Sequence, residues 1–261
     1  MEQSIFKKFS KYVSFNVLGM IGLSGYILAD TFLVSKALGA SGIAGLNLSI
    51  SVYSIIHGLG LMIGMGGATR YSILKMQKED ERSNGIYSLS IFLGVILGVT
   101  LALIGLVGSE GLAVLLGADK TILPYTKTYL TVILVFAPFL ITNNVLLAFV
   151  RNDNSPRLSM AAMITGSMTN IILDYIFMFP LGMGMFGAAL ATGLAPIASM
   201  IVLMIHFIAK NNSFKFTKIK VKVKSIIDIF SLGLSAFITE FSSAVVLVTF
   251  NLIILNIEGN I

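Results

Sequence analysis

The sequence predicts an all-α fold, that of a polytopic helical membrane protein, and three observations support this class. Hydrophobic residues make up 56% of the 261 residues. Charged residues make up only 11%, whereas soluble domains carry roughly 25%. The apolar residues are also grouped in long runs, and a helix needs about 20 of them in succession to cross a bilayer. Lipid is therefore the expected solvent for most of the chain.

Seven apolar runs are predicted to be membrane-spanning helices. In chain order they are Tyr12–Val34, Ile43–Gly64, Ile86–Val107, Tyr125–Phe149, Leu158–Phe179, Phe186–Ile208 and Ile226–Leu255. The first run follows three lysines, as a signal peptide would, but it is too long for an ordinary signal peptide and contains Asp30. The second contains Gly60 and Gly64, four residues apart, which lets another helix approach closely. The last is long enough to cross at a tilt.

The fourth run differs from the others because Pro138 lies near its middle. A proline inside a helix removes a backbone hydrogen bond and clashes with the preceding turn, so we expect a bend there. The freed carbonyl groups can meet polar partners, and Asn143 and Asn144 follow in the same run as candidate lining of a substrate cavity. Pro138 is a candidate hinge, and a static kink fits the same residues.

The positions of Lys and Arg predict a cytoplasmic N-terminus. With this orientation, fifteen of the eighteen basic residues fall in cytoplasmic segments, and only Lys36, Lys120 and Lys127 fall outside. This bias is the one that the positive-inside rule describes. Five lysines between the sixth and seventh runs, Lys215 to Lys224, fit a topogenic linker and also fit attraction to anionic membrane lipid.

Other classes of protein have little support. The chain has no cysteine, which excludes disulfides, thiolate metal sites and a cysteine nucleophile. Its net charge of +6 is distributed between apolar runs rather than along one soluble face, so no nucleic-acid partner is expected. The sequence shows no nucleotide motif, no metal cluster and no nucleophile beside a base. We therefore predict neither an enzyme nor a bound cofactor.

Three acids lie inside apolar runs, where a carboxylate costs several kcal/mol and marks a functional site by default. Asp174 follows Asn170 by four residues, which places both on one helix face. Asp30 and Glu240 occupy two other runs. Each acid can instead serve only as a hydrogen-bonding partner of a neighbouring helix, and Glu240 can be a solvated acid that faces a cavity.

Three segments resemble the multidrug and toxic compound extrusion (MATE) transporters. They are Asp30–Gly39 (DTFLVSKALG), Phe149–Arg157 (FVRNDNSPR) and Met168–Asp174 (MTNIILD). The resemblance implies cation-coupled export through a cavity between two six-helix bundles, twelve spans in all. This chain ends just after its seventh span, so it resembles one N-terminal lobe plus the first helix of the second.

The resemblance therefore implies three parts. These are a six-helix N-terminal lobe at 1–208, a basic cytoplasmic linker at 209–225, and the first helix of an incomplete second lobe at 226–261. The remaining C-terminal lobe is the expected missing partner. The implied location is the plasma membrane of a bacterium, as a multi-pass protein.

The resemblance also implies a cation or proton site at Asp30, Asn170, Asp174 and Thr192. Two carboxylates and two neutral oxygens suit a proton or Na⁺ as the coupling ion, and repulsion between nearby carboxylates favours protonation of one of them. Glu240 matches an acid near the substrate cavity of some family members. The expected function is H⁺- or Na⁺-coupled antiport of an organic cation or amphiphilic drug by alternating access. A lipid-linked oligosaccharide flippase of the same superfamily and a non-transporting truncated product are the alternatives.

Overall fold

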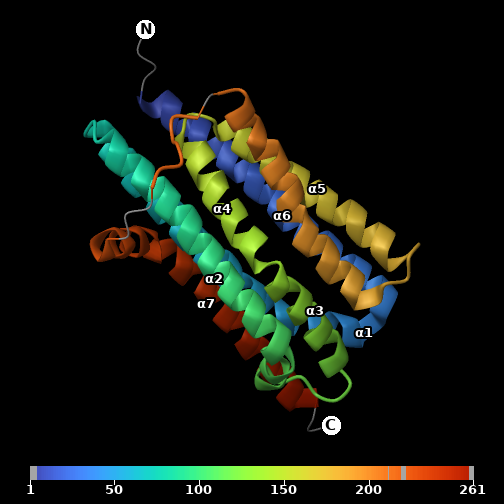
Figure 1. Cartoon of the computed structure of the whole chain (residues 1–261). Coiled ribbons are helices and arrows are strands. Elements are labelled where there is room, and N and C mark those ends of the chain that lie inside the picture. The colour runs from blue at the N-terminus through green and yellow to red at the C-terminus, as the bar shows by residue number, and fades with distance from the viewer. Residues whose placement is uncertain (1–4, 211, 219–221, 259–261) are drawn as a thin grey trace.

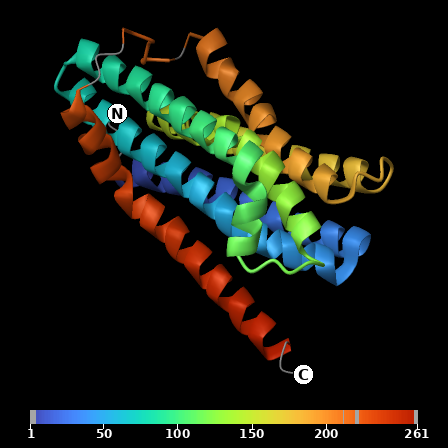
Figure 2. The same ribbon diagram turned by 60° about the horizontal axis from the view of Figure 1, so that its bottom comes forward.

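The computed structural model describes residues 5–210, 212–218 and 222–258, and Lys220 lies outside this part of the chain. Within it, every regular element is a helix. Helices α2 to α6 and the arms of α1 form a bundle, and α7 lies along its flank (Figures 1 and 2). The all-α class predicted from composition is confirmed.

Helix α1, Ile5–Met76, contains the first two predicted spans. A straight helix of 72 residues would be on the order of 110 Å long, whereas a hydrocarbon core is about 30 Å thick. The chain turns back at Gly39, which has φ 65° and ψ −156°, a conformation that only glycine adopts at little cost. The turn produces an N-terminal arm, 5–38, and a C-terminal arm, 40–76, which run in opposite directions (Figure 2).

The other helices follow the predicted runs closely. They are α2 (Asp80–Leu115), α3 (Leu123–Val135), α4 (Ala137–Asn152), α5 (Pro156–Met178), α6 (Gly184–Ile208) and α7 (Val223–Glu258). In the described residues, five helices are long and apolar enough to cross a membrane, or six when α3 and α4 form one broken span. Helix α1 is counted as one of these six spans, although it contains the first two predicted runs. The six spans therefore correspond to all seven predicted runs.

The predicted bend at Pro138 is a complete break. Helices α3 and α4 meet at Phe136 with an angle of 53°, and Pro138 is the second residue of α4. A proline is well tolerated there because the first turn of a helix has no internal partner for its N–H groups. Helix α2 closes on this break at Gly98, where a Cβ would lie 2.4 Å from the Cα of Pro138.

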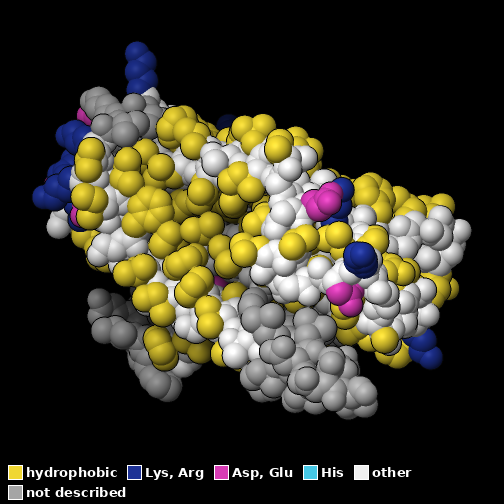
Figure 3. Space-filling model, turned by 90° about the horizontal axis from the view of Figure 1, so that it is seen from below, with side chains coloured by type: hydrophobic (Ala, Val, Ile, Leu, Met, Phe, Trp, Pro, Cys, Tyr) yellow, Lys and Arg dark blue, Asp and Glu magenta, His cyan; other side chains and the backbone are white. Residues whose placement is uncertain are grey.

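The outer surface of the bundle is apolar, as contact with lipid requires. Large hydrophobic side chains are exposed along α2 and α6, including Leu103, Val107 and Ile201. On the face that Figure 3 shows, hydrophobic side chains cover much of the described surface. A group of Lys and Arg side chains lies at one end, and a few more lie toward the other end. We call the end with the group the basic end. It is formed by the end of α1, the start of α2 and the end of α6, where Lys75, Arg82 and Lys210 occur in the sequence.

The segment 212–218, in the predicted linker, lies packed against the basic end of the bundle. Phe214 is fully buried, with ring contacts to Tyr71, Tyr87 and Phe149. The backbone N–H groups of Lys215 and Thr217 donate hydrogen bonds to side chains of α2, at Asn84 and Ser88. The described part of the linker is therefore fixed across the bundle by one aromatic side chain and by its own backbone.

Helix α7 contacts the C-terminal arm of α1 at backbone distance. A Cβ placed on Gly66 would lie 1.9 Å from the carbonyl oxygen of Ile229, and one on Gly233 would lie 1.9 Å from that of Met62. Two glycines that face the opposite backbone are the usual means by which membrane helices approach closely. The seventh span is thus joined to the bundle through α1.

We expect Gly66→Ala to lower the free energy of unfolding by about 1–3 kcal/mol, because the added methyl group must push α7 away from α1. The matched control is Gly85→Ala in α2, where a Cβ meets nothing within 4 Å. Thermal unfolding of both variants in detergent checks the expectation. Equal melting temperatures for the two variants would contradict the close approach.

Candidate functional site

Helix α5 places Asn170 and Asp174 on its inner face. The two residues are one helical turn apart, and both side chains are completely buried. Gly166, one turn earlier, faces α6, where a Cβ would lie 3.2 Å from the carbonyl oxygen of Ala195. The small residue lets α6 approach, and this approach brings Thr192 opposite Asn170.

The Asn170 amide connects α5 to α6. In the orientation that satisfies both ends, its Nδ2 donates to Asp174 Oδ2 over 3.0 Å, and its Oδ1 accepts from Thr192 Oγ1 over 3.2 Å. The reverse orientation sets the amide oxygen against a carboxylate oxygen and directs the amide nitrogen to Thr192 Oγ1. Thr192 Oγ1 also lies 3.1 Å from the carbonyl oxygen of Ala188, so its single proton has two possible acceptors.

Asp30, on the N-terminal arm of α1, completes the group. Its side chain is 4% exposed, and it is close enough to Asp174 for the two carboxylates to repel each other. Oδ1 of Asp30 and Oδ1 of Asp174 are both buried without a hydrogen-bond partner among the described residues. The structure therefore brings the four sequence-predicted ion-site residues into one region, which we call the buried acid site.

The oxygen atoms of the buried acid site are suitable ligands for a proton or Na⁺. Carboxylate, amide and hydroxyl oxygens are hard ligands, and two carboxylate oxygens lack partners. Among the described residues, no three side chains of His, Cys, Asp or Glu are grouped as candidate metal ligands. Any bound Na⁺ would therefore depend on the neutral oxygens of Asn170 and Thr192 as well as on the acids.

Tyr129 of α3 is a member of this site that the sequence reasoning missed. Its hydroxyl lies 3.4 Å from Thr192 Oγ1, and its side chain is 2% exposed. A lone tyrosine in an apolar run is ordinary in sequence. Only the packing of α3 against α6 reveals it.

A cavity of about 690 Å³ adjoins the buried acid site. Its lining comes from both arms of α1 and from α4, α5, α6 and α7, and includes Asn170 and Thr192. The predicted cavity residues Asn143, Asn144 and Glu240 line it as well, whereas Asp30, Asp174 and Pro138 do not. The acids therefore lie behind Asn170 and Thr192 as seen from the cavity.

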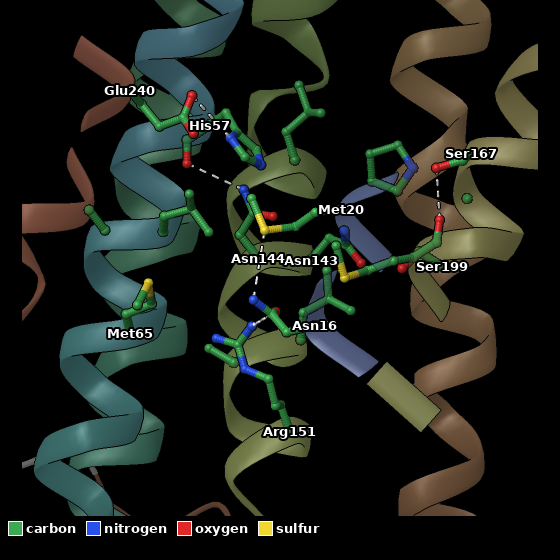
Figure 4. A pocket seen from close by; sticks show the side chains of 18 of the residues that line it. Asn16, Met20, His57, Met65, Asn143, Asn144, Arg151, Ser167, Ser199 and Glu240 are labelled. Atoms are coloured by element: carbon green, nitrogen blue, oxygen red, sulfur yellow. Dashed lines mark hydrogen bonds and ion pairs between the residues drawn. The ribbon is translucent and has the colours of Figure 1, made fainter. Parts of the chain in front are cut away.

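Glu240 of α7 lies close to His57 of α1 at the cavity wall. Glu240 Oε2 lies 3.7 Å from His57 Nδ1, and Asn144 Nδ2 donates to the carbonyl oxygen of His57 over 3.3 Å (Figure 4). Gly58 makes room for this arrangement, since a Cβ there would lie 2.9 Å from the Cβ of Glu240. The acid of the seventh span is thus held against the bundle.

Aromatic side chains extend from His57 toward the buried acid site. The ring of Tyr53 is stacked on His57 with centroids 6.0 Å apart, and its hydroxyl lies 2.8 Å from that of Tyr26. Tyr26 precedes Asp30 by one helical turn, so both lie on the same side of α1. A series of side-chain contacts, which includes one ring stack and one hydrogen bond, therefore leads from Glu240 to Tyr26, one helical turn before Asp30.

Arg151 is a second cavity residue that the sequence reasoning missed. The positive-inside pattern predicts that it lies in a cytoplasmic segment, and the structure shows that it belongs to the last turn of α4 and lines the cavity. Its Nη1 donates to Asn16 Oδ1 over 2.5 Å. Figure 4 shows it at the opposite end of the cavity from Glu240.

We expect Thr192→Val to lower the free energy of unfolding by about 1 kcal/mol. The change removes the hydroxyl donor of the buried Asn170 oxygen, which keeps the Thr192 backbone N–H as its other donor, and it removes the acceptor of the Tyr129 hydroxyl. Thr100→Val is the control, because among the described residues that exposed hydroxyl bonds to the carbonyl oxygen of Ile96 in its own helix and to no other helix. Thermal unfolding curves measure both. If the two variants lose the same stability, Asn170 does not depend on Thr192.

Comparison with known proteins supports this interpretation of the fold. The protein is 31% identical over 212 residues to the multidrug export protein MepA of Staphylococcus saprophyticus, and 34% identical over 199 residues to that of Staphylococcus aureus strain MRSA252. These matches cover 80% and 75% of this chain but only 47% and 44% of the relatives. The chain therefore spans about half the length of the curated relatives it matches.

Solved structures give the same result. A multidrug resistance MATE family transporter of the MOP superfamily in an inward-facing conformation superposes with a TM-score of 0.80 at 27% identity. The match includes 85% of this chain and 51% of that structure's chain. An outward-facing conformation superposes with a TM-score of 0.79 at 28% identity, covered to 51% by 87% of this chain. The MatE family model matches residues 16–176, more than half of the sequence, and the chain belongs to the MatE family.

Proposed function

We propose that this protein acts in the export of organic cations or amphiphilic drugs, in exchange for H⁺ or Na⁺. The observation that carries the proposal is a pair of buried, partner-deficient carboxyl groups directly behind the wall of an apolar cavity. The names of its relatives, multidrug export proteins, support the same class of substrate. The family consists of transporters, and we propose no catalysis and no cofactor besides the coupling ion.

The cavity is the proposed substrate site. Its wall is largely apolar, with Met20, Leu61 and Met65 among its residues, and such side chains adapt to ligands of different shape. Glu240 supplies a carboxylate for the cationic group of the ligand. His57 competes for that carboxylate, so an organic cation must displace the imidazole or share the carboxylate with it.

The buried acid site is the proposed ion site. The Asn170 amide is placed to respond to the protonation of Asp174. Ionised Asp174 accepts a hydrogen bond from the amide nitrogen, as in the satisfied orientation. Protonated Asp174 can instead donate to the amide oxygen, which favours the reverse orientation. The amide nitrogen then donates to Thr192 Oγ1, and the Thr192 hydroxyl donates its hydrogen bond to the carbonyl oxygen of Ala188.

The reversal of the Asn170 amide would alter the cavity wall, because Asn170 and Thr192 both line the cavity. A bound ion can shift the protein between two conformations only through a difference in its affinity for them. Similarity to both inward-facing and outward-facing structures supports alternating access as the overall cycle. The break between α3 and α4 beside Pro138 is the proposed hinge, and the membrane potential adds about 2.3 kcal/mol per charge per 100 mV.

The wider organisation is part of the proposal. Residues 1–208 form the first lobe, 209–225 a cytoplasmic linker in contact with membrane lipid, and 226–261 the first helix of a second lobe, of which 259–261 lie outside the described residues. The N-terminus is cytoplasmic and the membrane is a bacterial plasma membrane. The close contact between α1 and α7 at Gly66 and Gly233 supports a junction of two lobes at this position.

A flippase for lipid-linked oligosaccharides is the less favoured alternative. Its cavity must neutralise a pyrophosphate, which requires several cationic side chains. Of the residues that line the cavity in the described part of the chain, Arg151 is the single Lys or Arg. Glu240 on the opposite wall further disfavours a doubly charged anion.

We expect Asp174→Asn to abolish ion-driven efflux while leaving the folded state intact, because the amide fills the same space without taking up a proton. The assay is accumulation of a fluorescent organic cation by everted membrane vesicles, with pH and Na⁺ gradients imposed separately. Glu110→Gln is the control, since that exposed acid pairs only with Lys127 at the surface. Undiminished ion-driven efflux in Asp174→Asn would refute the site, and no efflux by the unaltered protein would leave the non-transporting product as the better explanation.

We expect Glu240→Gln to weaken the binding of an organic cation about tenfold or more, the usual range for a lost charge-assisted hydrogen bond. Binding of an uncharged analogue should change little. Fluorescence titration of the purified protein with the two ligands measures the difference. Equal weakening of both ligands would show that Glu240 shapes the cavity rather than recognising charge.

A further inference from the structure

Arg151 is a cation without a carboxylate partner at one end of the cavity. Its single hydrogen bond among the described residues joins Nη1 to the amide oxygen of Asn16. A guanidinium group carries five N–H donors and remains charged throughout the physiological range. Its side chain is only partly exposed and lines the cavity, so several donors remain available there.

The acid next in sequence is already occupied. Asp153 lies 2.9 Å from His206 Nε2, accepts a hydrogen bond over 2.8 Å from the backbone N–H of Ser213, and also contacts the hydroxyl of Ser213. No acid in the described part of the chain forms an ion pair with Arg151 at 4.0 Å or less. The guanidinium charge is therefore left for a ligand.

The cavity is consequently bipolar. Glu240 and His57 lie at one end and Arg151 at the other (Figure 4). Asn144 marks the level of His57 through its hydrogen bond to the His57 carbonyl oxygen. Asn144 and Arg151 are separated by seven residues of α4, which corresponds to roughly 10 Å along a helix axis.

We infer that Arg151 forms an oxyanion subsite, and that the cavity prefers amphiphiles that carry a carboxylate or phosphate in addition to a cationic group. The two charges of such a ligand would be on the order of 10 Å apart, so that the oxyanion meets Arg151 and the cation meets Glu240. Arg pairs with carboxylate or phosphate through two parallel hydrogen bonds. This inference rests on the proposed function, because it assigns part of the same cavity.

The test compares two ligands that differ only in the oxyanion. One is a fluorescent aromatic amine with a carboxylate at the stated separation, and the other is its methyl ester. The unaltered protein should bind the acid more tightly than the ester. Arg151→Gln should reduce the ratio of the two affinities about tenfold, as expected for loss of a charge-assisted hydrogen bond, and Arg151→Lys should restore part of it.

The control is Arg157→Gln, which removes an exposed guanidinium that lies over the ring of Phe15 outside the cavity lining. This variant should leave the ratio unchanged. If the unaltered protein binds the ester as tightly as the acid, the subsite is overturned whatever the variants do. If it binds neither, the proposed function fails, and the inference fails with it. If both ligands bind and Arg151→Gln weakens them equally, only the subsite is overturned.

A phospholipid headgroup could supply the same oxyanion, and a second arm separates the two sources. The titrations are repeated in nanodiscs with and without phosphatidylglycerol. A ratio that depends on Arg151 in both preparations assigns the subsite to the soluble amphiphile. If the preference for the acid over the ester disappears only when phosphatidylglycerol is present, lipid phosphate occupies the same subsite. This outcome also supports oxyanion recognition by Arg151.

Discussion

Two carboxyl groups, Asp30 and Asp174, lie buried in a bundle whose outer surface is apolar, and no cation pairs with either in the described part of the chain. A charge in such surroundings costs several kcal/mol unless neighbouring dipoles, a proton or a cation compensate it. The helices supply part of this compensation: α5 provides Asn170, α6 provides Thr192, and α3 provides Tyr129. The convergence of α1, α3, α5 and α6 therefore makes it possible to accommodate these acids. The part of the charge that remains uncompensated is the basis on which we propose an exchangeable ion at this site.

The same reasoning extends to the cavity, where charges are separated rather than gathered. Glu240 is held near His57 by the approach of α7 to α1 at Gly58, and Arg151 is held by Asn16 at the other end. The aromatic series from His57 through Tyr53 to Tyr26 connects this cavity with the acids behind its wall. Substrate and ion are proposed to act at the two ends of this series. Close packing at Gly58 is what brings Glu240 to its cavity end.

Most of the fold could be predicted because a backbone in hydrocarbon must satisfy its own hydrogen bonds, which leaves the helix as the available form for each apolar run. The breaks were harder. Gly39 falls between two predicted runs, but the helical assignment continues through it, since one residue with positive φ is enough to reverse the chain. Pro138 marked the fourth run as irregular, yet the break is centred on Phe136, because a proline fits the first turn of the new helix.

The sequence by itself determined the all-α class, the apolar runs and the pairing of Asn170 with Asp174, since these depend on composition and on spacing within one helix. Only the tertiary structure decided that Asp30 and Thr192 join that pair, that Tyr129 belongs to the same site, and that Arg151 lines the cavity opposite Glu240. These relations join side chains from different helices. They depend on how each helix is rotated and how closely it approaches its neighbours, and such approach is set by packing at small residues far apart in the chain.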